Sequence, residues 1–195
     1  MNSATGLTFK IATTASEFDQ IHQLNYRTFV EEIPQHPKNP HGRLVDRFHA
    51  ENTYLICLRE AELIGMLAVR GQRPFSLDQK LANLDSYLPP GHRIVEVRLL
   101  AIKSGFRHGP ILPGLLKLLA HFCIPQGYDL AIISGTKRQQ KLYRHLGFVP
   151  FGPQVGGGEA VFQPMFITLA TFQSWLNTMN AEEADSSRSP DCATD

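Results

Sequence analysis

The segment from Arg93 to Phe151 constrains the fold most strongly, because extended and helical patterns alternate along it. Arg93–Ile102 (RIVEVRLLAI) is apolar at all but three positions, which predicts a strand. Pro110–Cys123 predicts a helix, because both of its prolines stand in the first turn, where a missing N–H costs little. Tyr128–Ile133 predicts the next strand. This order favours an α/β domain with a mixed sheet.

The rest of the chain supplies further strands and helices. We expect strands at Phe9–Thr13, Thr53–Arg59, Leu63–Arg70, Phe148–Phe151 and Ala160–Leu169. We expect helices capped by Ser16 and by a Thr136/Gln139 capping box, the second ending at Gly147, and a last helix at Thr171–Asn180. The loops are Pro34–Asn52, an insertion at Gly71–Pro90, and Gly152–Gly158.

Composition sets limits on the function. A length of 195 residues favours one domain, and a net charge of +1 argues against a strongly basic nucleic-acid binder. The three cysteines stand far apart, which is typical of a reduced, cytoplasmic protein. We expect no signal peptide and no membrane span, since every apolar stretch is shorter than about 18 residues. The histidines lack ligand spacing, so we expect no metal.

The last fifteen residues, 181–195, differ from the rest in charge. They hold five acidic residues and one arginine, with several serines, and we expect a disordered acidic tail. Residues 1–180 then form the single folded domain with a net charge of +5. A mildly basic domain suits an anionic ligand.

The loop Lys103–Gly109 joins the long strand to the helix that follows. A helix N-terminus presents free N–H groups and the positive end of the helix dipole, so this loop, with Lys103, Arg107 and His108, is a candidate phosphate cradle. A plain turn explains its two glycines equally well. Both interpretations remain open from these residues.

The run Leu142–Phe148 (LYRHLGF) resembles the helix-to-strand signature of the GNAT superfamily of N-acyltransferases. The resemblance covers about Phe9 to Leu169 and implies the GNAT fold: a central mixed, mostly antiparallel twisted sheet of about seven strands, flanked by helices. It also implies that Tyr143 protonates the departing thiolate of an acyl thioester. The alternative is that Tyr143 is an aromatic side chain packed on the sheet.

The same resemblance implies a site for the donor. The backbone near a strand bulge would hold the thioester carbonyl and the pantetheine amides, and the cradle would hold the diphosphate. The positions implied are Leu100, Ala101, Ile102, Lys103, Arg107, His108, Gly109 and Ile111. The chain departs from the family's Arg/Gln-x-x-Gly-x-Gly/Ala pattern, because Pro110 and Leu112 occupy the two small positions. That departure counts against coenzyme A as the donor.

The N-terminal half is similar to one branch of this superfamily, the acyl-homoserine-lactone synthases and long-chain N-acyl amino acid synthases. The matching positions are Arg27 and Phe29, Asp46, a Gly65–Arg70 strand, and Glu96 with Arg98. Many members of this branch take acyl chains from acyl carrier protein. The resemblance implies acceptor binding by Arg27, Phe29, Asp46, Arg70 and Arg98. The first loop lacks the tryptophan that is usual there in the lactone synthases, which favours plain N-acylation.

Glu96 and Arg98 are two residues apart on one strand and so face the same side. Glu96 is either a base for the attacking amine or half of a structural ion pair. We therefore expect transfer of an acyl group to a primary amine, possibly that of an amino acid, from acyl-CoA, acetyl-CoA or acyl carrier protein phosphopantetheine. The alternatives are an acetyl-CoA-dependent N-acetyltransferase and a catalytically weak acyl-thioester-binding module. The oligomeric state does not follow from the sequence.

Overall fold

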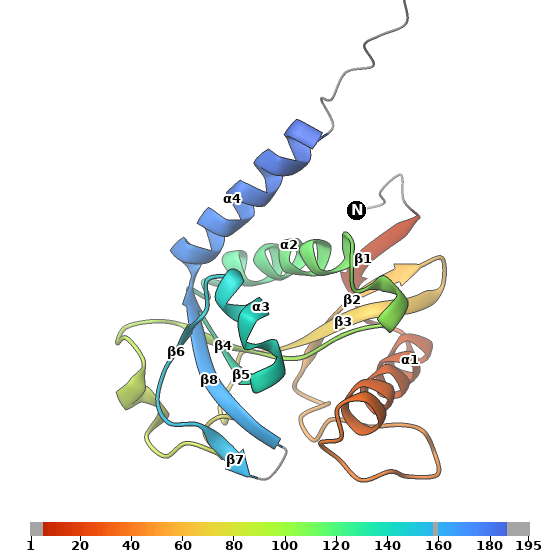
Figure 1. Cartoon of the computed structure of the whole chain (residues 1–195), viewed down its shortest axis with the longest axis horizontal. Helices are drawn as coiled ribbons and strands as arrows, with labels where there is room; N and C mark the ends of the chain where they lie inside the picture. The colour runs from red at the N-terminus through yellow and green to blue at the C-terminus, as the bar shows by residue number, and fades with distance from the viewer. Residues whose placement is uncertain (1–5, 158–159, 187–195) are drawn as a thin grey trace, which may run out of the picture.

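The computed structural model describes residues 6–157 and 160–186, which form one eight-stranded sheet with helices on both faces (Figure 1). The strands are β1 Leu7–Ile11, β2 Thr53–Arg59, β3 Glu62–Arg70, β4 Ile94–Ile102, β5 Leu130–Thr136, β6 Val149–Pro150, β7 Val155–Gly157 and β8 Ala160–Thr168. The α-helices are α1 Ala15–Tyr26, α2 Ile111–Cys123, α3 Gln140–His145 and α4 Leu169–Ser186. The expected mixed α/β fold is confirmed, with β7 as a strand in the predicted Gly152–Gly158 loop.

The two faces of the sheet carry separate cores because strand residues alternate in direction. On β2, Leu55 and Cys57 pack with α2, whereas Tyr54 and Ile56 pack with α1. Figure 1 shows α1 (orange) and α2 (green) on opposite sides of the sheet. Any opening through the sheet would therefore connect the α1 side with the α2 side.

The strands run in the order β1-β2-β3-β4-β5-β8-β6, with β7 beside β8. All the pairs are antiparallel except β4 and β5, which are parallel and in register only over Ile94–Glu96 and Leu130–Ile132. Beyond Glu96, β4 continues along β3 while β5 continues along β8. The two strands thus separate and leave a wedge in the middle of the sheet.

A β-bulge lies in β4 beside this wedge. Met66 pairs with Ala101 and Ala68 pairs with Arg98, so Leu67 alone faces two residues, Leu99 and Leu100. Leu99 has a φ of 55°, in the left-handed region that a leucine rarely adopts. The bulge bends β4 and re-aims the backbone next to the wedge.

Helix α1 begins two residues earlier than the sequence indicates. Its N-cap is Thr14 rather than Ser16: the Thr14 hydroxyl accepts from the N–H of Glu17, and the Glu17 carboxylate accepts from the N–H groups of Thr13 and Thr14. Thr14 and Glu17 thus form a capping box. Ser16 cannot form one, because it has no glutamate or glutamine three residues later. After Tyr26 the chain continues as a π-helix over Arg27–Glu32.

Two further boundaries differ from the sequence-based prediction. The Thr136 hydroxyl bonds the Gln139 side chain instead of capping a helix, and a 3-10 turn over Lys137–Gln139 precedes α3. Gly147 does follow α3 with a φ of 93°, as predicted. Helix α4 runs to Ser186, so residues 181–186 of the expected disordered tail are helical, and residues 187–195 lie outside the described part.

The insertion between β3 and β4 packs across the sheet next to β5, β7 and β8. It contains one short 3-10 helix, Leu84–Tyr87. Its apolar side chains form a third core with strand residues; the insertion contributes Phe75, Leu77, Leu81, Leu84 and Leu88. The insertion therefore covers the α1-side face of β5 and belongs to the folded domain.

Candidate active site

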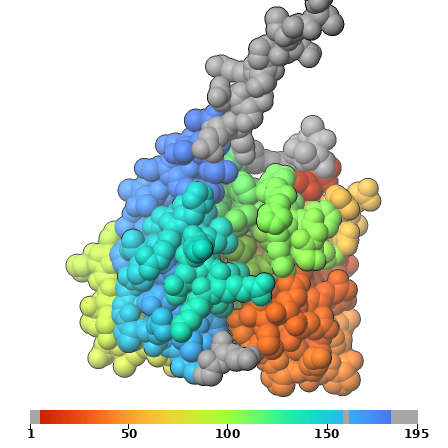
Figure 2. Space-filling view, in the orientation of Figure 1, coloured from red at the N-terminus to blue at the C-terminus, as the bar shows by residue number. Residues whose placement is uncertain are grey.

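A pocket of about 560 Å³ occupies the wedge between β4 and β5. Its lining comes from α1, the π-helix and loop after it, the insertion, strands β3, β4, β5 and β8, and helices α2, α3 and α4. Figure 2 shows the segment around α3 (cyan) beside the N-terminal segment (orange) on one face of the molecule, and both contribute lining residues. Its size falls in the range of pockets that hold small organic ligands.

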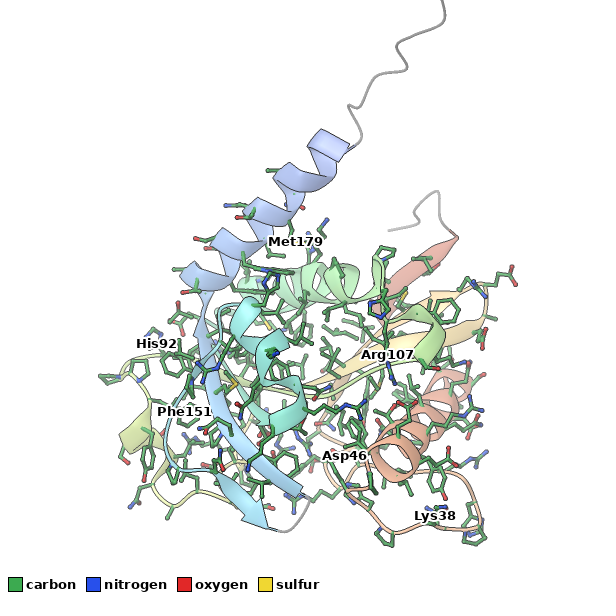
Figure 3. All side chains as sticks on the ribbon, viewed as in Figure 1. Lys38, Asp46, His92, Arg107, Phe151 and Met179 are labelled. Carbon is green, nitrogen blue, oxygen red and sulfur yellow. The ribbon has the colours of Figure 1, made fainter. Side chains whose placement is uncertain are left out.

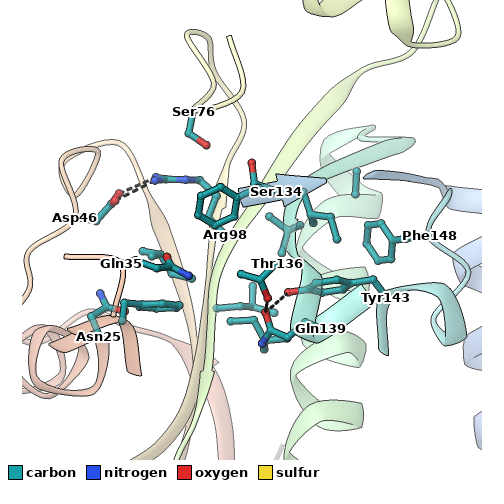
Figure 4. A pocket seen from close by; sticks show the side chains of 18 of the residues that line it. Asn25, Gln35, Asp46, Ser76, Arg98, Ser134, Thr136, Gln139, Tyr143 and Phe148 are labelled. Carbon is teal, nitrogen blue, oxygen red and sulfur yellow. Dashed lines mark hydrogen bonds and ion pairs between the residues drawn. The ribbon is translucent and has the colours of Figure 1, made fainter. Parts of the chain in front are cut away.

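The two ends of the pocket differ in chemistry. On the α1 side, the lining is largely polar and includes Asn25, Gln35, Asp46, Ser76 and Arg98. On the α2 side, it is apolar, with Leu116, Leu119, Ile133, Leu146, Phe148, Ile167 and Phe172. Figure 4 shows Asn25, Gln35 and Asp46 at one end and Tyr143 and Phe148 at the other. The pocket therefore passes through the sheet from a polar chamber to an apolar chamber.

Asp46 and Arg98 form the main ion pair of the polar chamber. The two guanidinium Nη atoms bind the two Asp46 carboxylate oxygens at 2.7 and 3.0 Å. Asn52 and the N–H of Phe48 also donate to this carboxylate. Burial opposes ionisation, but the hydrogen bonds and charge of Arg98 hold the pKa of Asp46 below its usual range. Both sequence-predicted residues line the pocket (Figure 4).

Two polar side chains beside the wedge lack partners within the described part of the chain. Asn25 is fully buried, and neither its amide nitrogen nor its amide oxygen is hydrogen-bonded. The hydroxyl of Ser134 on β5 is also buried without a partner. A buried polar atom without a hydrogen-bond partner costs roughly 1–3 kcal/mol of stability. Such an atom is expected in a binding site, where a bound ligand supplies the missing hydrogen bond. Sequence reasoning missed both residues.

Tyr143 on α3 lines the pocket on the Phe148 side, and its hydroxyl points toward the middle of the pocket (Figure 4). Its hydroxyl donates to Gln139 Oε1 at 3.3 Å, and the Thr136 hydroxyl binds the same oxygen at 3.1 Å. Its ring packs edge-on against Phe148, with centroids 5.9 Å apart. Burial raises the pKa of Tyr143 to about 12, so the phenol is protonated at neutral pH. Tyr143 therefore both packs against Phe148 and lines the pocket.

Glu96 is held by hydrogen bonds from the insertion. Its carboxylate is fully buried and accepts from the Ser76 hydroxyl at 2.5 Å, the Ser76 N–H at 2.8 Å and the Leu77 N–H at 3.2 Å. It is not among the described residues that line the pocket. The carboxylate thus fastens the insertion to β4 and lies 3.6 Å from Arg98 Nε, while the role of Glu96 as a base stays a prediction.

The cradle loop lies apart from the pocket. Arg107 donates to the Ile102 carbonyl and pairs with Glu32 of the π-helix (Figure 3). Lys103 pairs with Glu62 at 2.6 Å, and His108 and Gly109 are exposed. Residues 102–112 contribute nothing to the described lining of the pocket. Lys103 and Arg107 of this loop thus form surface ion pairs.

The other predicted site residues also fall into two groups, those that line the pocket and those that do not. Phe29 and Leu100 line the pocket, whereas Arg27 is exposed outside it. Arg70 is buried, donates to the Pro74 carbonyl at 2.8 Å and lies over the Phe48 ring. Ala101, Ile102 and Ile111 pack in the cores on either side of the sheet. These four buried or partly buried positions support the fold rather than the pocket.

An open sheet with a wedge between two parallel strands, a bulge beside it and a tyrosine lining the wedge defines the GNAT fold. Two solved structures of acyl-homoserine lactone synthases share this fold. BjaI with MTA has a TM-score of 0.74 at 18% identity, over 90% of each chain. LasI has a TM-score of 0.71 at 17% identity, over 90% of this chain and 96% of that one.

A third structure with this fold is FeeM, an N-acyl amino acid synthase from uncultured soil microbes. Its TM-score is 0.68 at 16% identity, over 89% of this chain and 97% of that one. The family model described as N-acyl amino acid synthase FeeM matches residues 20–160. The chain belongs to this family and is an acyltransferase. A comparison with curated protein sequences finds no match.

No described helix is long and apolar enough to cross a membrane.

Proposed function

We propose that the protein transfers a long acyl chain from a phosphopantetheine thioester to the amine of an amino acid. The observation that carries this proposal is the pocket through the sheet, with an apolar chamber on the α2 side and a polar chamber on the α1 side. An acyl chain suits the first chamber and a zwitterionic acceptor suits the second. The acetyltransferase alternative would need only a short apolar pocket.

The reaction centre lies where the two chambers meet, next to the bulge of β4. The amine nitrogen attacks the thioester carbonyl, and the resulting oxyanion accepts from backbone N–H groups near Leu99 and Leu100, on the β4 edge that lacks a β5 partner. The C–S bond then breaks, the nitrogen loses a proton, and the sulfur leaves as a thiol. A phenol with a pKa of about 12 is a weaker acid than a thiol, so Tyr143 stabilises the sulfur chiefly as a hydrogen-bond donor.

The polar chamber fits an acceptor that carries both an amine and a carboxylate. Asp46 and Arg98 largely neutralise each other, while Arg47 and Lys80 add two positive charges to the lining. These cations suit the carboxylate of an amino acid. The unpartnered Asn25 amide supplies a donor and an acceptor for the remaining polar groups of the substrate.

The N-terminus of α2 favours acyl carrier protein over coenzyme A as donor. Pro110 and Pro113 lack N–H groups, and Arg107 is paired with Glu32, so few donors remain for a diphosphate. Carrier protein offers phosphopantetheine without the nucleotide. Next to Tyr143, the exposed face of α3 and the turn before it carry Lys137, Arg138, Lys141 and Arg144, which suit an acidic protein.

The test is product detection by mass spectrometry. The purified protein is incubated with an amino acid mixture and with one donor at a time: long-chain acyl carrier protein, long-chain acyl-CoA or acetyl-CoA. We expect an N-acyl amino acid, with one free thiol released per product, fastest from the carrier protein. Lys141→Glu should raise KM for the carrier protein and leave KM for acyl-CoA unchanged, because the charge lies outside the pocket.

Two results would contradict the proposal. Faster transfer from acetyl-CoA than from either long-chain donor would favour the acetyltransferase alternative. Binding of long-chain donors, seen as a higher melting temperature, with no thiol release would favour the binding module.

A further inference from the structure

A second, smaller cavity of about 30 Å³ lies beyond the apolar end of the pocket. It is lined by residues of β4, α2, β5 and β8, and by the start of α4. Like the apolar chamber, it is surrounded mainly by hydrophobic side chains, among them Val95, Ala120, Cys123 and Leu130.

Four residues line both cavities and therefore form the partition between them: Leu119, Ala131, Ile167 and Phe172. Leu119 belongs to α2, while Ala131 and Ile167 face each other on β5 and β8. Phe172 comes from the first turns of α4 and is only 8% exposed. Its aromatic ring is the largest side chain of the four.

Phe172 is held in place from the outside. The Trp175 ring stacks on it with centroids 6.2 Å apart and an angle of 4° between the planes. Trp175 packs against the same core but lines neither of the two cavities among the described residues. A substitution of Phe172, which lines both cavities, and one of Trp175, which lines neither, therefore form a matched pair.

We propose that Phe172 is the chain-length stop of this acyltransferase: its ring closes the apolar chamber and sets the longest acyl chain that binds fully. This inference rests on the proposed function, since it assigns the acyl chain to that chamber. Removal of the ring would join the smaller cavity to the pocket and extend the chamber toward β4 and the end of α2.

The physical reason is the value of each buried methylene. Each CH₂ that enters the chamber contributes about 0.8 kcal/mol, which is about a fourfold gain in affinity. That gain ends where the chain meets a wall that cannot move without disturbing a packed core. A plot of log kcat/KM against chain length should therefore rise steadily and then break at one length.

The experiment measures kcat/KM for a series of saturated acyl thioesters on one carrier, with wild type, Phe172→Ala and Trp175→Ala. In Phe172→Ala we expect the fourfold rise per methylene to continue past the wild-type break. In Trp175→Ala the break should keep its wild-type position, because that side chain does not line the chamber. A third variant, Ala131→Val, narrows the partition and should move the break to shorter chains.

The outcomes separate the inference from the proposed function. A break that stays in place in Phe172→Ala, or that moves equally in Trp175→Ala, would overturn the assignment of Phe172 while leaving acyl transfer intact. If Phe172→Ala does not fold, the direction of the shift in Ala131→Val decides. If wild type transfers no chain from any thioester, the proposed function itself fails and this inference fails with it.

Discussion

Tyr143 and Glu96 illustrate at the residue scale how surroundings decide the role of a side chain. Both are ionisable and largely buried, but they differ in their partners. The Tyr143 hydroxyl has one long hydrogen bond, to Gln139 at 3.3 Å, and faces the pocket. The Glu96 carboxylate has three donors from the insertion and lies away from the pocket within the described chain. The first is available to a substrate, and the second is occupied.

Tyr143→Phe should lower kcat for acyl transfer by about 10- to 100-fold, the value of one hydrogen bond to a charged sulfur. The melting temperature should change little, because the ring keeps its contact with Phe148. Steady-state kinetics with a long-chain thioester and a thermal unfolding curve measure both effects. An unchanged kcat would leave Tyr143 with a packing role only.

Glu96→Gln should lower the free energy of unfolding by about 2 kcal/mol, because the new amide group faces N–H donors that need an acceptor. Chemical denaturation measures this loss, and the exposed Glu62→Gln, which disrupts a surface pair, should lose less than about 0.5 kcal/mol. The folded variant should keep the acidic limb of its pH–rate profile. Loss of that limb would support the role of Glu96 as a base.

Sequence reasoning found part of the site for identifiable reasons. Tyr143 lies in a local motif, and Phe29, Asp46, Arg98 and Leu100 follow from the family resemblance. Asn25 and Ser134 carry no local signal, because only the three-dimensional structure brings helix α1 and strand β5 to the same wedge. Burial without a partner is their distinguishing property, and it is visible only in the folded chain.

At the scale of elements, local chemistry explains which boundaries were predictable. Gly147 marks the end of α3 because its φ of 93° favours glycine. The start of α1 is hard to predict because two candidate caps stand two residues apart, and only Thr14 has a glutamate three residues later. The β7 strand was missed because its Val-Gly-Gly sequence resembles a loop, and pairing with β8 overrides that local preference.

The capping box of α1 gives a pH prediction. Burial raises the pKa of Glu17, but hydrogen bonds from Lys10, Thr13 and Thr14 outweigh it and lower the pKa from 4.5 to about 2. A lowered carboxyl pKa means that the folded state holds its proton less tightly than the unfolded state. The stability from Glu17 is therefore complete above pH 4.5 and is lost as the pH falls toward 2.

Unfolding free energies of wild type and Glu17→Gln, measured from pH 7 downward, test this prediction. The difference between the two proteins should be constant at neutral pH and should shrink below about pH 4.5. Thr14→Ala is a matched control: it removes the other half of the box and should cost about 1 kcal/mol without that acid dependence. A difference that stays constant down to pH 2 would contradict the stated role of the carboxylate.

At the scale of the whole molecule, the decisive feature is the separation of β4 and β5. Two strands that pair over three residues and then part leave a passage between the two faces of the sheet. The chain places polar residues of α1 and its loop on one face and apolar residues of α2, β8 and α4 on the other. The donor and the acceptor can therefore reach the same point from opposite sides of the sheet.

Photolabelling tests this account most directly. A long-chain acyl thioester with a diazirine at the end of its chain is bound to the protein and irradiated, and the labelled peptides are identified by mass spectrometry. We expect labels on α2, β8 and the start of α4, around Leu119, Ile167 and Phe172, and competition by an unlabelled long-chain thioester. Labels on α1 and the loop from Gln35 to Arg47, or labels spread over the surface, would contradict the assignment of the apolar chamber to the acyl chain.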